Sequence, residues 1–200
     1  MWKETEILQQ IVVDTARICH TSPSIHLHES DRAAVLKDVY IDNVSSDGIT
    51  LKADCHAESF FKKNYGNKRC DYIILSQVGD KRVALFLDMK STALSNADVV
   101  DGFPHDLGRG YPGYVHQLRS SSCFFDFLHT VMKEFCSCSA LAKYKKNTQR
   151  FFVVFHVKDM SQITRPITRT RPQKNNTPDT ALILHVNNND HLDFESLVLI

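Results

Sequence analysis

The segment 70–92, CDYIILSQVGDKRVALFLDMKST, constrains most strongly what this chain can fold into. Its two apolar runs, 72–75 and 83–87, are separated by VGDK at 78–81, a pattern typical of a β-hairpin with a tight turn. The second run is apolar at every position, which predicts burial on both faces, as at the centre of a sheet covered by helices. Because hairpin strands are antiparallel, the entrance of the first strand meets the exit of the second.

Two carboxylates and one ammonium group stand at these strand ends: Asp71 before the first run, and Asp88 and Lys90 after the second. Mg²⁺ prefers oxygen ligands, typically one or two carboxylates. Asp71 and Asp88 are therefore the expected metal ligands, with the backbone carbonyl of Met89 as a third. Lys90 shares a strand face with Asp88 and is expected to orient water or stabilise phosphate charge. The pattern predicts phosphodiester hydrolysis that depends on Mg²⁺ or Mn²⁺.

The motif CD(x16)DMK resembles the PD-(D/E)xK nuclease superfamily, which has the restriction-endonuclease-like fold. Cys70 stands where that family usually has proline, and Asp88 stands where glutamate is also common. The resemblance implies a further metal ligand upstream, best matched by Glu58, with Asp54 as a second candidate. Members of the family close to the RecB type also carry a glutamine at the start of the following helix, which Gln117 matches and which we expect to contact nucleic acid.

The remaining elements can be read along the chain from hydrophobic periodicity. We predict a helix over 3–19, a polar loop over 24–31, a short helix or strand over 32–42, a strand over 49–55, a helix over 115–135, strands over 151–157 and 181–186, and a final strand or helix. Helices mixed with apolar central strands predict an α/β sandwich of two or three layers, with a mixed central sheet. The resemblance favours three layers and a restriction-endonuclease-like core.

Length and composition indicate one soluble globular domain, 1–200, with its core at about 49–186 and the first helix packed on it. The chain has 42% hydrophobic residues and a net charge of +1, so there is no global signal for polyanion binding. No apolar run approaches the roughly 18 residues that would span a membrane. Without a recognisable signal peptide, we expect a cytoplasmic protein with reduced cysteines and no membrane partner.

Basic residues are concentrated in 143–174, which holds nine of them against a single acid, Asp159. Such a local excess can hold phosphates even when the whole chain is nearly neutral. Contacts of this kind position nucleic acid without reading its sequence. The residues expected to contact the nucleic-acid backbone are Lys143, Lys145, Lys146 and Arg150.

The resemblance implies a nuclease that acts on DNA, with RNA as an alternative substrate. A chain of 200 residues leaves no room for a separate recognition domain, so a partner protein or a homo-oligomer is expected to supply specificity or activation. The resemblance alone suggests an effector in antiphage defence. The alternative is a non-catalytic module of the same fold that binds nucleic acid or protein.

Overall fold

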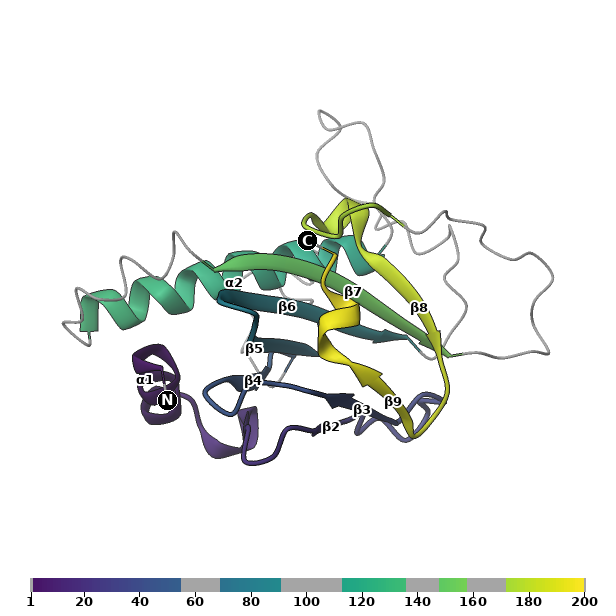
Figure 1. The fold of residues 1–200 in the computed structure, drawn as a ribbon, viewed down its shortest axis with the longest axis horizontal. Coiled ribbons are helices and arrows are strands. Elements are labelled where there is room, and N and C mark those ends of the chain that lie inside the picture. The colour runs from purple at the N-terminus through teal and green to yellow at the C-terminus, as the bar shows by residue number, and fades with distance from the viewer. Residues whose placement is uncertain (1, 55–68, 91–112, 136–147, 158–171, 200) are drawn as a thin grey trace.

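The computed structural model describes residues 2–54, 69–90, 113–135, 148–157 and 172–199 (Figure 1). The elements are α1 (Lys3–Ile11), η1 (Asp14–Ala16), β1 (Arg17–Cys19), β2 (Ile25–His28), β3 (Asp38–Asp42), β4 (Ile49–Lys52), β5 (Tyr72–Val78), β6 (Lys81–Lys90), α2 (Gly113–Phe135), β7 (Gln149–Val157), η4 (Pro178–Thr180), β8 (Leu182–Val186), β9 (Asp190–Asp193) and η5 (Phe194–Leu197). None of the helices in these ranges is long and apolar enough to cross a membrane.

The larger sheet has six strands in the order β1-β4-β5-β6-β7-β8. Strands β1, β4, β5 and β6 pair antiparallel, whereas β7 runs parallel to β6 and β8 runs parallel to β7. The expected mixed sheet is therefore confirmed. Helix α2 lies in the chain between the parallel strands β6 and β7, as parallel neighbours require a long crossover connection.

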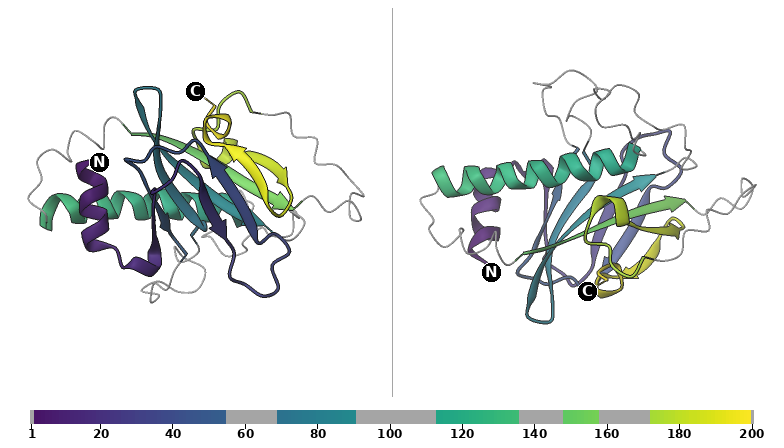
Figure 2. Two further views of the ribbon diagram at one scale, coloured as in Figure 1. Left: turned by 60° about the horizontal axis from the view of Figure 1, so that its bottom comes forward. Right: turned by 90° about the horizontal axis from the view of Figure 1, so that it is seen from above.

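The six-stranded sheet is covered on both faces, but by different kinds of structure (Figure 2). Ile73 and Phe86 point into a core shared with α1 and α2. Ile74 follows Ile73 on β5, and Leu85 precedes Phe86 on β6. Both point to the opposite face, into a core shared with the three-stranded sheet β2-β3-β9. The continuous apolar run of β6 is thus buried on both faces as predicted, with a small sheet in place of helices on the second face.

The predicted hairpin is present, and its turn depends on a glycine. Val78 pairs with Lys81 and Tyr72 pairs with Leu87, so two residues connect the strands. Gly79 has a φ of 59°, in the left-handed region that glycine adopts without steric cost. This register places the start of β5 opposite the end of β6, as the sequence predicts.

The predicted helix over 3–19 is wrong beyond its first half. Helix α1 ends at Ile11, and Arg17–Cys19 forms the edge strand β1, with Ile18 paired to Thr50 of β4. Ile7 and Leu8 do form a buried helical stripe, but Ile18 belongs to the sheet. Residues 17–19 form a strand because they can pair with β4, and local hydrophobic periodicity does not reveal this pairing.

The predicted polar loop over 24–31 is also wrong in part, because Ile25–His28 forms β2. Ile25 and Leu27 are buried while His26 and His28 are exposed, which is the alternation of a half-buried strand. Of the two alternatives for 32–42, the strand is correct at Asp38–Asp42. The strands and helix expected over 49–55, 115–135, 151–157 and 181–186 are confirmed with small shifts of their ends.

Candidate active site at the end of the hairpin

Asp71, Asp88 and Lys90 meet at one end of the six-stranded sheet, and we call these three residues the hairpin site. Asp71 lies just before β5, and Asp88 and Lys90 lie among the last three residues of β6. Alternation along the two strands places all three on the side of the sheet that α2 covers, because Ile73 and Phe86 face that helix. The hairpin thus brings together the groups that sequence reasoning selected.

Asp88 is fully buried at 0% exposure, and its carboxylate is poorly satisfied. Lys90 Nζ lies 2.8 Å from Asp88 Oδ2 and forms an ion pair with it. Within the described parts of the chain, however, neither oxygen of Asp88 accepts a hydrogen bond of good geometry. Buried carboxylates normally have such partners, so Asp88 retains the capacity to bind a cation.

Asp71 is held in place by the backbone of the facing strand. Its carboxylate accepts a hydrogen bond from the backbone N–H of Met89. Residues in a strand direct their N–H and C=O groups to the same edge, so the Met89 carbonyl also faces the Asp71 side. The contact of the Met89 N–H with Asp71 is therefore compatible with the expected role of Met89 as a backbone ligand.

The electrostatics of the hairpin site reflect an excess of buried negative charge. Burial, followed by the charge of Asp88, raises the pKa of Asp71 well above its usual range. Burial likewise raises the pKa of Asp88 to about 6, although Lys90 acts in the opposite direction. Burial disfavours the charge of Lys90, but the adjacent Asp88 outweighs this and raises the Lys90 pKa. A divalent cation would relieve the repulsion between the two acids.

Helix α2 fixes both strand ends through Gln117 and Ser121. Gln117 Oε1 accepts a hydrogen bond from Lys90 Nζ at 2.7 Å, and its Nε2 donates to the Arg69 carbonyl at 3.3 Å. Ser121 Oγ accepts from the backbone N–H of Cys70 at 2.7 Å. The expected nucleic-acid contact, Gln117, is thus hydrogen-bonded within the site, where it positions Lys90.

Cys70 fills the position that proline usually has in the resembled family, and here it serves packing. It is fully buried, and burial raises the pKa of its thiol above the ordinary range. Its Sγ donates to the Tyr72 carbonyl at 3.3 Å. A buried neutral thiol of this kind is unreactive, so the chemistry of the site belongs to the acids and Lys90.

A further acid adjoins the site. The charge of Asp54 raises the pKa of both Asp71 and Asp88, which places this second upstream candidate near the pair. Loss of hydration and then the charge of Glu29 raise the pKa of Asp54 itself, although Asp54 is exposed at the surface. Sequence reasoning missed Glu29, although the alternating Ile25–His28 strand just before it was the signal that could have located it. Glu58 lies outside the described residues.

Arg150 lies away from the hairpin site, so the structure separates this predicted nucleic-acid contact from the acids. It pairs with Ala84 near the start of β6, four residues before the Val154 that pairs with Asp88. Four residues of strand span about 13 Å. Arg150 also forms a two-pronged ion pair with Asp126, at 2.8 and 3.1 Å. The other three expected contacts, Lys143, Lys145 and Lys146, lie outside the described residues.

Comparisons with protein-family models, with curated proteins and with solved structures find no match to this chain. The hairpin site must therefore be judged on its own geometry. The residues present fit a hard divalent cation, since the buried carboxylate of Asp88 and the half-buried carboxylate of Asp71 offer oxygen ligands. The buried Asp88 carboxylate supports this fit, because its ion pair with Lys90 is not accompanied by a hydrogen bond of good geometry within the described residues.

Proposed function

We propose that this chain is a metal-dependent nuclease that hydrolyses phosphodiester bonds of DNA. One observation carries the proposal: two converging carboxylates, Asp71 and Asp88, lie beside Lys90 at one end of the sheet. Apart from its ion pair with Lys90, the buried carboxylate of Asp88 accepts no hydrogen bond of good geometry within the described residues. A structural ion pair would be expected to satisfy both oxygens of a buried carboxylate. An excess of buried acid instead suits a site that binds a cation.

The architecture supports a restriction-endonuclease-like core. Strands β4, β5 and β6 form an antiparallel meander, α2 follows, and β7 returns parallel to β6. The resembled family has its first acid at the start of one hairpin strand and its acid and lysine at the end of the next. Asp71, Asp88 and Lys90 occupy these places in the meander.

The chain's own residues have separable roles in this proposal. Asp71 and Asp88 would hold Mg²⁺ or Mn²⁺, with Met89 contributing its carbonyl and Glu58 or Asp54 as the further acid. The metal would activate water and neutralise charge on the phosphoryl oxygens. Lys90 would orient that water or bind a phosphate oxygen, because its ammonium group is held by Asp88 at 2.8 Å and by Gln117 at 2.7 Å.

The substrate and the biological setting rest on the resemblance. DNA is the proposed substrate, with RNA as the alternative, and the basic residues of 143–174 would contact its phosphates. A partner protein or homo-oligomer would supply specificity, and antiphage defence is the proposed setting. The alternative is a non-catalytic binding module, which would keep the fold and the basic segment but have no hydrolytic activity.

The test is cleavage of double-stranded DNA, single-stranded DNA and RNA by the full chain with Mg²⁺ or Mn²⁺. We expect Asp88→Asn and Lys90→Ala each to lower cleavage about 100-fold or more, the range seen when a group that stabilises developing charge is lost. The matched control is Asp179→Asn, which removes an exposed acid that pairs with Arg119, and it should cleave normally. Cleavage that survives both site variants would refute the assignment.

Metal binding provides a readout that does not depend on cleavage. Mn²⁺ binding, followed by the paramagnetic signal of the free ion, should be lost in Asp88→Asn and retained in Asp179→Asn. A wild-type chain that binds DNA but neither binds Mn²⁺ nor cleaves would favour the non-catalytic module.

A further inference from the structure

The outer face of the small sheet carries a group of ionisable side chains that the hairpin site does not use. On β2, Ile25 and Leu27 are buried in the core, so His26 and His28 project to the opposite face. The pairing of β2 with β3 places His28 directly across from Asp38. We call His26, His28 and Asp38 the histidine cluster.

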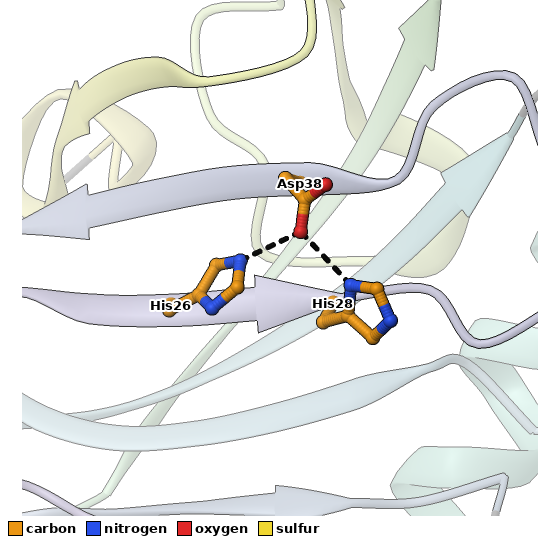
Figure 3. Close-up of side chains that lie close together, drawn as sticks. All are labelled: His26, His28 and Asp38. Carbon is orange, nitrogen blue, oxygen red and sulfur yellow. Dashed lines mark hydrogen bonds and ion pairs between the residues drawn. The ribbon is translucent and has the colours of Figure 1, made fainter.

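Both imidazoles of the histidine cluster converge on the same atom (Figure 3). His26 Nε2 lies 2.7 Å from Asp38 Oδ1, and His28 Nδ1 lies 2.8 Å from that oxygen. The three ligand atoms all lie within 4.8 Å of one another, and among the described residues this is the one group of three such atoms. The side chains remain 46%, 51% and 29% exposed, so an ion can reach them from solvent.

We propose that the histidine cluster binds a divalent transition-metal ion of the zinc class, with His26 Nε2, His28 Nδ1 and a carboxylate oxygen of Asp38 as ligands. Imidazole nitrogen with a carboxylate suits Zn²⁺ and its transition-metal neighbours, whereas Mg²⁺ prefers oxygen alone. On binding, His26 Nε2 and His28 Nδ1 would coordinate the ion through their lone pairs, and each neutral ring would carry its single proton on the other nitrogen. Three protein ligands leave one tetrahedral position open for water or an external group.

The two separations between imidazole nitrogen and carboxylate oxygen require little rearrangement. The two imidazole nitrogens lie within 4.8 Å of each other and would settle at the tetrahedral separation. Tetrahedral zinc with bonds of 2.0–2.2 Å separates neighbouring ligand atoms by about 3.3 Å. The observed separations of 2.7 and 2.8 Å would therefore widen by about half an ångström, to admit an ion in place of a proton. Exposed side chains on a strand can make this change by small rotations about their χ angles.

The cluster is also held in position before any ion binds. The ring of His26 stacks on Tyr40 with centroids 4.7 Å apart and planes 13° apart. The backbone of His28 is fixed at both polar groups: its N–H donates to Tyr72 Oη at 2.9 Å, and its carbonyl accepts from that hydroxyl at 2.7 Å. Fixed ligands lose less conformational entropy when they bind.

The same sheet surface offers a matched control in His191. Its ring stacks on the other side of Tyr40, with centroids 4.6 Å apart, and its Nδ1 lies 3.0 Å from Asp42 Oδ2. His191 is thus an exposed histidine with a carboxylate partner, but it lacks the second imidazole that completes the cluster. A zinc site that depends on three ligands should distinguish His191 from His28.

The decisive experiment is Zn²⁺ titration by calorimetry, with the full chain free of any histidine tag and stripped of metal by a chelator. We expect wild type and His191→Ala to bind one more equivalent of Zn²⁺ than the double variant His26→Ala, His28→Ala. That equivalent should bind about 100-fold or more weakly in His28→Ala alone, since even outer-shell changes weaken metal sites 10- to 100-fold. Equal binding by wild type and the double variant, or equal loss in His191→Ala, would overturn the proposal.

A second measurement on the wild-type chain needs no variant. Substoichiometric Zn²⁺ should first shift the ring C–H signals of His26 and His28 in NMR spectra and leave those of His191 in place. Shifts that begin at other histidines among the ten in the chain would overturn the assignment. The inference does not rest on nuclease activity, because Asp88→Asn should leave the zinc equivalent of the histidine cluster intact.

Discussion

The hairpin site and the histidine cluster both join carboxylates to basic side chains, yet burial gives them opposite electrostatics. Asp88 is fully buried, and loss of hydration raises its pKa to about 6 in spite of Lys90. Asp38 lies near the surface, and hydrogen bonds from His28 and then His26 lower its pKa. Where water remains, the hydrogen bonds dominate; where water is excluded, desolvation dominates.

This difference also separates the ions that the two sites suit. The hairpin site offers oxygen atoms in a buried setting and fits a hard cation such as Mg²⁺. The histidine cluster offers two nitrogens and one oxygen at the surface and fits Zn²⁺. The same contrast between buried and exposed charges recurs elsewhere in the chain and sets the size of the effect expected from each substitution.

Breaking the buried pair of Glu4 and His129 should lower the free energy of unfolding more than any other change considered below. Their side chains are 3% and 4% exposed, and His129 Nε2 lies 2.5 Å from Glu4 Oε1, which joins α1 to α2. His129→Ala leaves a carboxylate buried without its partner and should lower the free energy of unfolding by about 3–5 kcal/mol in urea titrations.

The matched control for that change is Lys133→Ala, one turn later on α2. Lys133 pairs with Glu134 at 3.5 Å, and both side chains are about 60% exposed, at 59% and 61%. The loss there should be below about 1 kcal/mol. Similar losses for the two variants would mean that burial does not govern these pairs.

Asp88→Asn should raise stability in the presence of a chelator, although it is expected to abolish cleavage. The change removes a buried charge that accepts no hydrogen bond of good geometry among the described residues, while the amide oxygen can still lie beside the Lys90 ammonium group. We expect a gain of about 1–3 kcal/mol, the cost of an unsatisfied buried polar group. A loss of stability would show that Asp88 is a structural partner of Lys90 and would weaken the metal-site proposal.

His20 should make folding sensitive to mild acid. It is buried, its Nδ1 lies 2.8 Å from the Ser45 carbonyl, and burial lowers its pKa below the ordinary value of 6.5. Below about pH 6.5 the unfolded chain binds a proton that the folded chain does not, so the free energy of unfolding falls as pH falls toward the lowered pKa. Between pH 7 and pH 5 the free energy of unfolding of His20→Gln should fall by about 1 kcal/mol less than that of the wild type. The same pH dependence in both proteins would show that His20 is not the group responsible.

Asp38→Asn should have the smallest effect on stability, below about 1 kcal/mol, because its contacts to His26 and His28 are near the surface. The same variant should lose the zinc equivalent of the histidine cluster. A large loss of stability without any change in zinc binding would show that Asp38 stabilises the fold and is not a zinc ligand.

The hairpin site could be predicted because its information is local. The apolar run of β6 and the turn at Gly79 determine the register, and the register brings Asp71 to Asp88. Gln117 was identified as a polar residue early in α2, but its contact with Lys90 depends on how the helix docks. The separation of Arg150 from the site depends on the register of β7 against β6, which pairs Arg150 with Ala84 across a long connection.

The small sheet could not be predicted because its partners are far apart along the chain. His26 and His28 make the segment look polar, although Ile25 and Leu27 alternate with them as a strand requires. The strand β3 gains its second neighbour only from β9. Without that partner in view, a short polar segment with two histidines has no reason to be assigned to a sheet.

The parallel pairing of β3 with β9 has a consequence for the order of folding. Contacts such as that of Asn43 with Asp193 span 150 residues. The loss of chain entropy makes closing a loop of that length cost roughly 2 kcal/mol more free energy than closing a loop of ten residues. The β5–β6 hairpin can form locally, whereas an isolated β2–β3 hairpin is marginal until β9 arrives. The acidic site thus belongs to the part of the protein that can assemble early, and the histidines acquire their final setting only when distant segments meet.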